Sequence, residues 1–294
     1  MSSKVIEYPA LWIAGAACSG CSVSLLNAIN PSIQNVLVDP VIPGKHVSLR
    51  FHATVMAGQG EPVIKVLKDT TKEKPKEYIL IVDGSIPTGD DGLYCRLGEF
   101  NGKEVTMKEV TADLAKDALA VLAVGTCASY GGIPSGAPIP TDAKPAMEFF
   151  KEEGISTPLI NIPGCPPHPD WMIGTIAGIL LNGLPGPDEL DEKLRPKTYF
   201  GNLIHDNCPR RAYFDAGQFA KNTSDPGCLY EIGCKGPYTY ADCPSRQWNN
   251  GVNWCIGAGA QCIACVEPDF LDKFAPMFKK IDEDGLEAFK IKTR

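Results

Sequence analysis

The side chains best suited to binding soft metals are concentrated toward the C-terminal end of this chain. Seven of its twelve cysteines and one of its four histidines lie between positions 205 and 265. Thiolate and imidazole groups spaced in this way form disulfides, bind zinc or hold iron-sulfur clusters. Several of the cysteines form close pairs, which favours metal chelation because a disulfide there would close almost no loop. The group consists of His205, Cys208, Cys228, Cys234, Cys243, Cys255, Cys262 and Cys265.

A second group of cysteines follows short apolar segments nearer the N-terminus. Each segment has the length and composition of a buried strand, and each ends at a cysteine-bearing loop beside Gly or Pro. In open parallel sheets the functional crevice lies outside the carboxyl ends of the strands, so these thiols should converge on one edge. Single cysteines are often only small buried hydrophobic residues, but the shared position favours a four-thiolate site. Its members are Cys18, Cys21, Cys127 and Cys165.

The elements that position this second group alternate between strands and helices. Such alternation predicts a parallel sheet with helices on both faces. The expected strands are residues 10–17, 47–53, 78–82, 120–124 and 158–162. The expected helices are residues 22–30, with Ser22 as the N-cap, 61–70, 107–118, 144–151 and 169–181.

A segment rich in Gly, Pro and acidic residues, 182–192, predicts a domain boundary. We expect one domain over residues 1–184 and a second over residues 185–294. Apolar periodicity fades in the second domain, so bound metal should supply part of its stability. The tail residues Phe270, Phe274 and Phe278 are interpreted as a packing segment rather than an amphipathic helix.

Composition and charge exclude several classes of function. The formal net charge of -7 leaves no basic footprint for nucleic acid. The most apolar run, 171–181, contains Gly174 and Gly178 and is too short to span a bilayer, so no membrane span is expected. The N-terminal residues carry no signal-peptide pattern and no twin arginine. The protein is therefore expected to stay where it is made, unless a leader is missing from this sequence.

Eleven cysteines and one histidine divide into three sets of four potential ligands. Three structural zinc sites would be unusual in one pair of domains, and one of them would occupy the functional edge of the sheet. Three iron-sulfur clusters in series, by contrast, can conduct electrons from a buried site to the surface. The sets are Cys18, Cys21, Cys127 and Cys165; His205, Cys208, Cys228 and Cys234; and Cys243, Cys255, Cys262 and Cys265.

Six sequence blocks, in order from one end of the chain to the other, resemble the small subunit of nickel-iron hydrogenases. The resemblance implies a flavodoxin-like parallel-sheet domain followed by a mostly irregular, cysteine-rich iron-sulfur domain. The blocks are CSGCSVSLLN, VGTCASYGGIP, NIPGCPPHPDW, IHDNCPR, GCLYEIGCKGP and CIACVEPDF.

The resemblance implies a role for each of the three sets. The first set matches the ligands of a proximal 4Fe-4S cluster, and the set with His205 matches those of a distal 4Fe-4S cluster. The medial cluster matches Cys243, Cys262 and Cys265. Commoner members of the family have proline in place of Cys255 and carry a 3Fe-4S medial cluster. We therefore predict a medial 4Fe-4S cluster, as in the selenium-containing branch, with a free Cys255 thiol as the alternative.

Other positions also depart from parts of the family. Oxygen-tolerant relatives place two extra cysteines where this chain has Gly20 and Gly132, so their 4Fe-3S cluster is not expected. Many relatives have glutamate where this chain has Ala17, so no proton transfer by that side chain is expected.

Four residues of suitable chemistry fall outside the three sets. Cys95 has no partner at ligand spacing and is interpreted as a structural or free thiol. His168 is interpreted as a hydrogen-bonding neighbour of the proximal site, and His46 and His52 as strand or loop histidines.

The resemblance implies an electron-transfer subunit of a hydrogenase, which interconverts dihydrogen with two protons and two electrons. The nickel-iron centre would belong to an obligate large subunit facing the loops around Cys18, and electrons would leave near His205 to a carrier such as a multihaem cytochrome. The resemblance implies the periplasm, whereas the visible N-terminus is also compatible with the cytoplasm. Two alternatives are a cluster-bearing subunit of a quinone-reducing complex and a zinc-stabilised binding module.

Overall fold

The structure is a computed structural model that describes residues 5–40, 42–136, 140–268, 270–271 and 274–282. The chain forms two compact units, Met1–Leu194 and Arg195–Arg294. The division falls after Leu194, whereas the sequence analysis placed it after Leu184. Hydrogen bonds explain the longer first unit. The backbone N–H of Asn161 donates to the Leu194 carbonyl at 2.9 Å, and its side-chain amide donates to the Lys193 carbonyl at 2.9 Å.

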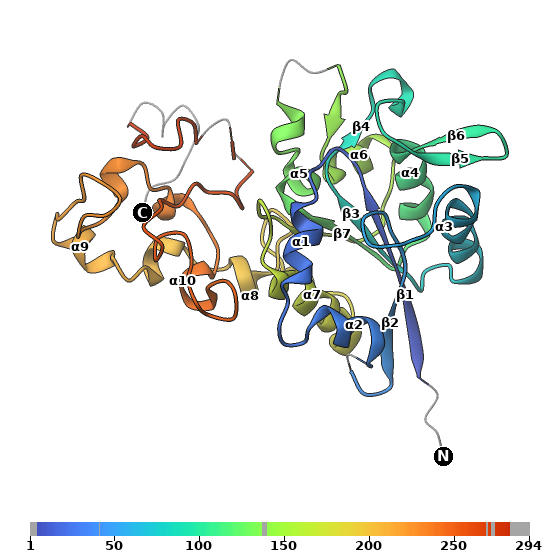
Figure 1. The fold of residues 1–294 in the computed structure, drawn as a ribbon, viewed down its shortest axis with the longest axis horizontal. Helices are drawn as coiled ribbons and strands as arrows, with labels where there is room; N and C mark the ends of the chain where they lie inside the picture. The colour runs from blue at the N-terminus through green and yellow to red at the C-terminus, as the bar shows by residue number, and fades with distance from the viewer. Residues whose placement is uncertain (1–4, 41, 137–139, 269, 272–273, 283–294) are drawn as a thin grey trace. The chain divides into compact units, whose positions relative to one another are not determined.

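The first unit is built on a five-stranded sheet in the order β2-β1-β3-β7-β9, and every neighbouring pair is parallel. This is the strand order of flavodoxin-like folds, and the predicted α/β class is confirmed (Figure 1). The strands are β1 (Ile6–Ala14), β2 (Lys45–His52), β3 (Ile79–Asp83), β7 (Ala120–Val124) and β9 (Leu159–Ile162).

The long helices connect these strands and start at recognisable signals. The Thr106 hydroxyl caps α4 by accepting a hydrogen bond from the Glu109 N–H at 3.2 Å. A proline in the first turn opens both α3 and α7, where its missing N–H costs nothing. The helices are α1 (Gly20–Leu26), α2 (Ile33–Val38), α3 (Glu61–Glu73), α4 (Met107–Asp117), α5 (Gly125–Tyr130), α6 (Ala146–Glu152) and α7 (Pro169–Asn182).

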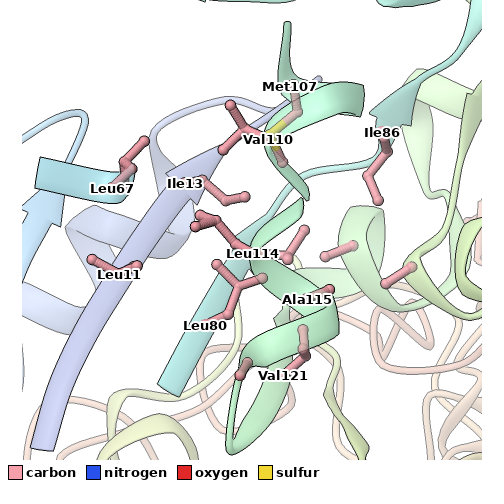
Figure 2. Close-up of a cluster of buried hydrophobic side chains, with 14 of the residues drawn as sticks. Leu11, Ile13, Leu67, Leu80, Ile86, Met107, Val110, Leu114, Ala115 and Val121 are labelled. Carbon is pink, nitrogen blue, oxygen red and sulfur yellow. The ribbon is translucent and has the colours of Figure 1, made fainter. Parts of the chain in front are cut away.

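Alternate residues of the strands build the main core against α3 and α4. Leu11 and Ile13 of β1 and Leu80 of β3 meet Leu67 of α3 and Leu114 of α4 (Figure 2). All five side chains are buried. The central strands are apolar on both faces, as expected for a parallel sheet covered on both sides.

Some elements were not predicted because they are too short to show a clear hydrophobic periodicity. They are α2, the antiparallel pair β4 (Ile86–Pro87) with β8 (Ala143–Lys144), and the hairpin β5 (Arg96–Phe100) with β6 (Lys103–Thr106).

The second unit has little regular structure in its described part, as predicted. Its helices are α8 (Lys197–Phe200), α9 (Arg211–Asp215) and α10 (Cys243–Arg246). A small cluster of Tyr238, Ala264, Phe274 and Ile281 forms an apolar core. Phe274 thus packs inside, while Phe278 is 66% exposed. Nowhere in the described residues is a helix both long and apolar enough to cross a membrane.

Candidate metal centres

The proximal set lies at the carboxyl edge of the five-stranded sheet. Cys18 lies in the loop that follows β1, Cys127 lies in α5 directly after β7, and Cys165 lies in the loop after β9. Cys21 belongs to the first turn of α1, which begins at Gly20. The prediction that Ser22 caps this helix was therefore wrong: the flanking residue is Ser19, and Ser22 is buried inside the helix.

The four proximal thiols lie close enough to influence one another. Burial raises the pKa of Cys127 to about 11, and the neighbouring Cys165 and Cys18 thiolates add to this effect. Burial, the Asp83 carboxylate and the Cys127 and Cys18 thiolates all raise the pKa of Cys21. Burial and the Cys18 thiolate raise the pKa of Cys165. The raised pKa values favour neutral thiols, so the thiolate form needs a cationic group among them, which is what a bound metal or cluster supplies.

Two glycines allow this close packing of sulfurs, and both have positive φ. A Cβ on Gly125, whose φ is 88°, would stand 2.6 Å from the Cys21 sulfur. A Cβ on Gly132, whose φ is 54°, would stand 2.9 Å from the Cys127 sulfur. A side chain at either position would therefore displace a candidate ligand. The sequence analysis did not assign this role to either glycine.

Asp83 is a further residue that the sequence analysis missed. It ends β3, is 1% exposed, and accepts a hydrogen bond from Trp12 Nε1 at 3.2 Å. Burial raises its pKa to about 6, partly offset by hydrogen bonds from Cys21, Trp12 and Ser22. An acidic residue closing a wholly apolar strand was the available sequence signal.

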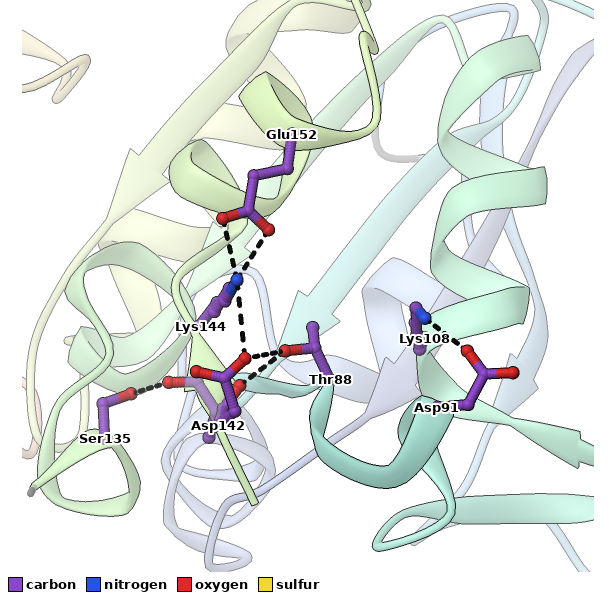
Figure 3. Close-up of polar contacts among 8 residues, drawn as sticks. Thr88, Asp91, Lys108, Ser135, Asp142, Lys144 and Glu152 are labelled. Atoms are coloured by element: carbon purple, nitrogen blue, oxygen red, sulfur yellow. Dashed lines mark hydrogen bonds and ion pairs between the residues drawn. The ribbon is translucent and has the colours of Figure 1, made fainter. Parts of the chain in front are cut away.

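The chain that follows α5 is tied back to β4 and α6 by polar contacts (Figure 3). The Ser135 hydroxyl donates to the backbone carbonyl of the residue before Lys144. The Thr88 hydroxyl donates to the Asp142 carboxylate at 2.6 Å, and Lys144 Nζ contacts the Glu152 carboxylate at 2.7 Å. These contacts fasten Asp142 and Lys144, which precede α6, to Thr88 and to Glu152 of α6.

The other four candidate residues of the first unit are not members of this set of four thiols. His168 is buried at the start of α7, where its Nδ1 accepts a hydrogen bond from the Asp170 N–H at 3.0 Å. His46 and His52 both belong to β2. The half-buried Cys95 sulfur lies 3.9 Å from the Ala14 carbonyl. All twelve cysteines lie within the described ranges, and none of them forms a disulfide.

The distal set surrounds a small cavity in the second unit. His205, Cys208, Cys228 and Cys234 all line it, together with apolar residues. His205 is 9% exposed, and its Nε2 is buried without a hydrogen-bond partner among the described residues. Burial lowers the pKa of His205, which favours the neutral ring that can bind a metal. Burial raises the pKa of Cys234 to about 11, while the backbone N–H groups of Gly236 and Cys262 lower it.

The medial set is also gathered, with Cys255 included. Burial, followed by the Cys265 and Cys255 thiolates, raises the pKa of Cys243 well above that of a free thiol. Burial, followed by the Cys234 thiolate, raises the pKa of Cys262, and the Cys265 thiolate contributes too. The structure thus brings Cys255 near Cys243 although twelve positions separate them in the sequence.

The donor sets fit iron-sulfur clusters in their chemistry. Each set has four soft ligands, and backbone N–H groups approach several sulfurs, as is usual around such clusters. One example is the Gly236 N–H, which donates to Cys234 Sγ at 3.5 Å. Within the described residues no three His, Cys, Asp or Glu side chains converge tightly enough to hold a single metal ion. Ligands of a four-iron cluster bind different irons and need not converge on one point.

Comparisons with known proteins identify relatives of both units. A family model for the C-terminal part of the NiFe/NiFeSe hydrogenase small subunit matches residues 200–278. A model described as NADH ubiquinone oxidoreductase, 20 Kd subunit, matches residues 18–179.

Two similar proteins and one solved structure match along nearly the whole chain. The periplasmic [NiFeSe] hydrogenase small subunit of Desulfomicrobium baculatum is 46% identical, over 95% of this chain and 89% of that protein. The periplasmic [NiFe] hydrogenase small subunit 1 of Nitratidesulfovibrio vulgaris is 38% identical, over 92% of this chain and 81% of that protein. A crystal structure of the reduced, active Ni-Fe-Se hydrogenase from Desulfomicrobium baculatum matches with a TM-score of 0.87, covering 93% of this chain and 99% of that one.

Proposed function

This chain belongs to the small subunits of nickel-iron and nickel-iron-selenium hydrogenases, and from that premise we propose that it relays electrons through three 4Fe-4S clusters to an external carrier. As a hydrogenase small subunit it serves electron transfer, and the active site lies on the large subunit. The observation that supports the proposal is the proximity of residues within each predicted set: proximal and medial thiols shift one another's pKa values, and the four distal residues line one cavity.

Each cluster, when bound, would supply reversible one-electron chemistry. The proximal cluster would be held by Cys18, Cys21, Cys127 and Cys165. The distal cluster would be held by His205, Cys208, Cys228 and Cys234. The medial cluster would be held by Cys243, Cys255, Cys262 and Cys265.

This chain's own residues shape the environment of those ligands. The Gly236 N–H stabilises negative charge on the Cys234 sulfur, and the Gly20 N–H does the same for Cys18 at 3.3 Å. The ring of Phe214 packs edge-on against the His205 imidazole, with 4.5 Å between centroids, and helps exclude water from it. Such exclusion and hydrogen bonding are the means by which a protein sets cluster potentials.

We place the large subunit against the sheet edge around Cys18. Cys18 and Cys165 are both exposed in this chain, although a cluster bound there would need protection from water. Apolar side chains continue the same surface along α1, with Val23 51% and Leu26 50% exposed. Unpaired apolar surface beside an exposed cofactor site is the feature expected of an obligate interface.

The external carrier is expected near His205, and a multihaem cytochrome is the candidate class. The surface there carries both signs of charge. Arg211 forms ion pairs with two carboxylates, those of Asp206 and Asp215. The relatives named periplasmic support a periplasmic location for this chain.

The test is the iron, zinc and acid-labile sulfide content of the purified heterodimer, with electron paramagnetic resonance (EPR) before and after reduction. We expect about twelve irons per small subunit and no 3Fe-4S signal in the oxidised state. About eleven irons with that signal would keep the electron-transfer role but reject the fourth medial ligand. Zinc in place of iron would instead favour a zinc-stabilised binding module.

A further inference from the structure

Lys235 is a lysine buried in the iron-sulfur unit with no ion-pair partner in the described part of the chain. Its side chain is 1% exposed. Its Nζ donates a hydrogen bond to the backbone carbonyl of Lys279, which is neutral. Burying an ammonium group is unfavourable unless a negative charge lies nearby, so the position calls for an anionic neighbour.

The turn that contains Lys235 connects the distal ligands to the medial ligands. Lys235 directly follows Cys234, and its backbone N–H donates to the Cys262 carbonyl at 2.8 Å. Thr239, at the end of the same turn, donates its hydroxyl to the Lys235 carbonyl at 2.7 Å and lies 3.6 Å from the Cys262 sulfur. One predicted distal ligand, Cys234, and one predicted medial ligand, Cys262, therefore lie beside this lysine.

The ammonium group is held close to this turn. Its hydrogen-bond partner Lys279 packs directly on Gly233, the residue before Cys234: a Cβ on Gly233 would stand 2.6 Å from the Lys279 nitrogen. The positive charge therefore lies beside the distal ligand Cys234, on a turn whose backbone also bonds to the medial ligand Cys262.

We propose that the Lys235 ammonium is a fixed positive charge that raises the reduction potentials of both clusters beside it, the distal one at Cys234 and the medial one at Cys262. The inference rests on the proposed function, because it requires clusters at both sites. Reduction adds one negative charge to a cluster, and a nearby positive charge stabilises the reduced form more than the oxidised form. The effect is strong because burial removes most of the screening by water.

The alternative is that Lys235 only tethers the backbone at Lys279. A tether depends on length and hydrogen bonding, whereas a potential depends on charge. Replacing lysine with methionine preserves most of the shape and removes the charge, and replacing it with arginine preserves the charge. Lys280 provides the matched control, because it is exposed, lies in the same unit and pairs with Glu231 at 2.7 Å.

The experiment is an EPR-monitored redox titration of the whole heterodimer carrying Lys235→Met, Lys235→Arg or Lys280→Gln, with iron content measured on each sample. We expect Lys235→Met to shift the medial and distal midpoint potentials to more negative values at unchanged iron content. Lys235→Arg should stay near the wild-type potentials, and Lys280→Gln should shift neither, because solvent screens its charge.

Unchanged potentials in fully loaded Lys235→Met would overturn the proposal. So would an equal shift in Lys235→Arg, which would indicate shape rather than charge. If Lys235→Met loses iron, Lys235→Gln replaces it in the titration, and loss of iron from all three Lys235 variants would assign a packing role instead. Absence of iron-sulfur clusters from the wild type would be a failure of the proposed function and would be seen before any variant is compared.

Discussion

At the scale of single residues, we predict that the Cys255 thiol sets the composition of the medial cluster. It lies near Cys243, although an alternative for it is a free thiol. We expect Cys255→Ala to lower the iron content from about twelve to about eleven per chain, because a cluster with three ligands loses one iron. The oxidised protein should also gain a 3Fe-4S EPR signal.

Cys95→Ala is the control for Cys255→Ala, since Cys95 belongs to none of the three sets. It should leave both the iron content and the spectrum unchanged. If Cys255→Ala also retains full iron without a 3Fe-4S signal, Cys255 is a free thiol.

The absence of a side chain at Gly125 is as important to the proximal site as the ligands themselves. Gly125→Ala would place a Cβ 2.6 Å from the Cys21 sulfur, in a backbone conformation that alanine rarely adopts. We expect the variant to lose about four irons per chain as the proximal cluster fails to assemble. Gly178→Ala, in a helix where the added Cβ meets no atom within 4 Å, should keep all of its iron. Equal iron content in both variants would show that Cys21 tolerates the displacement.

At the scale of elements, a buried ion pair holds the loop that contains the medial pair Cys262 and Cys265. Arg195 Nη1 donates to the Glu267 carboxylate at 3.1 Å, and that carboxylate also accepts the Tyr240 N–H at 2.8 Å. Both charged side chains are nearly fully buried. Glu267→Gln should lower the free energy of unfolding by ~3–5 kcal/mol, because a neutral amide offsets the buried arginine charge much less than the carboxylate does.

Loss of visible cluster absorbance in a urea titration measures this change. Glu231→Gln removes a carboxylate from an exposed pair and should cost less than ~1 kcal/mol. If both variants lower the free energy of unfolding by similar amounts, the buried pair stabilises the fold no more than the surface pair does.

The edge strand β2 contains a histidine that should make stability depend on pH. His52 is 2% exposed, stacks on Trp12 with 4.8 Å between ring centroids, and has a pKa lowered by burial. As pH falls below the ordinary histidine pKa of about 6.5, His52 binds a proton in the unfolded chain but stays neutral in the folded chain. The free energy of unfolding is therefore unaffected by His52 at neutral pH and decreases as pH falls below about 6.5.

We expect His52→Phe, which can still stack on Trp12, to reduce this pH dependence. The measurement is the free energy of unfolding of the wild type and the variant between neutral pH and the pH at which the clusters dissolve. Parallel curves for the two proteins would rule out His52 as the source.

At the scale of the whole molecule, the apolar surface on α1 should determine assembly with the large subunit. Leu26→Lys introduces a charge where an apolar contact is expected, so the dissociation constant of the heterodimer should rise about tenfold or more. Co-purification and the concentration dependence of the heterodimer measure this effect. Met147→Lys, on α6 at a comparable exposure of 45%, is the control and should assemble normally. Equal assembly of the two variants would place the interface elsewhere.

Local patterns in the sequence were sufficient for the parallel sheet, while the grouping of potential ligands stays a prediction. An apolar run ending at a cysteine, as at Val124 and Cys127, predicts where a thiol falls because parallel strands share one carboxyl edge. The start of α1 and the existence of α5 were missed, because short segments rich in Gly and Ser have weak local signals.

The sequence alone determined which donor atoms are available to a metal, since cysteine and histidine supply thiolate and imidazole groups wherever the chain folds. Tertiary structure alone decided what surrounds those ligands. Asp83 reaches Cys21, Gly125 packs against the same sulfur, and the Lys235 backbone N–H bonds to the Cys262 carbonyl. In each case the partners are brought together by packing between separate segments of the chain, which no local spacing in the sequence records.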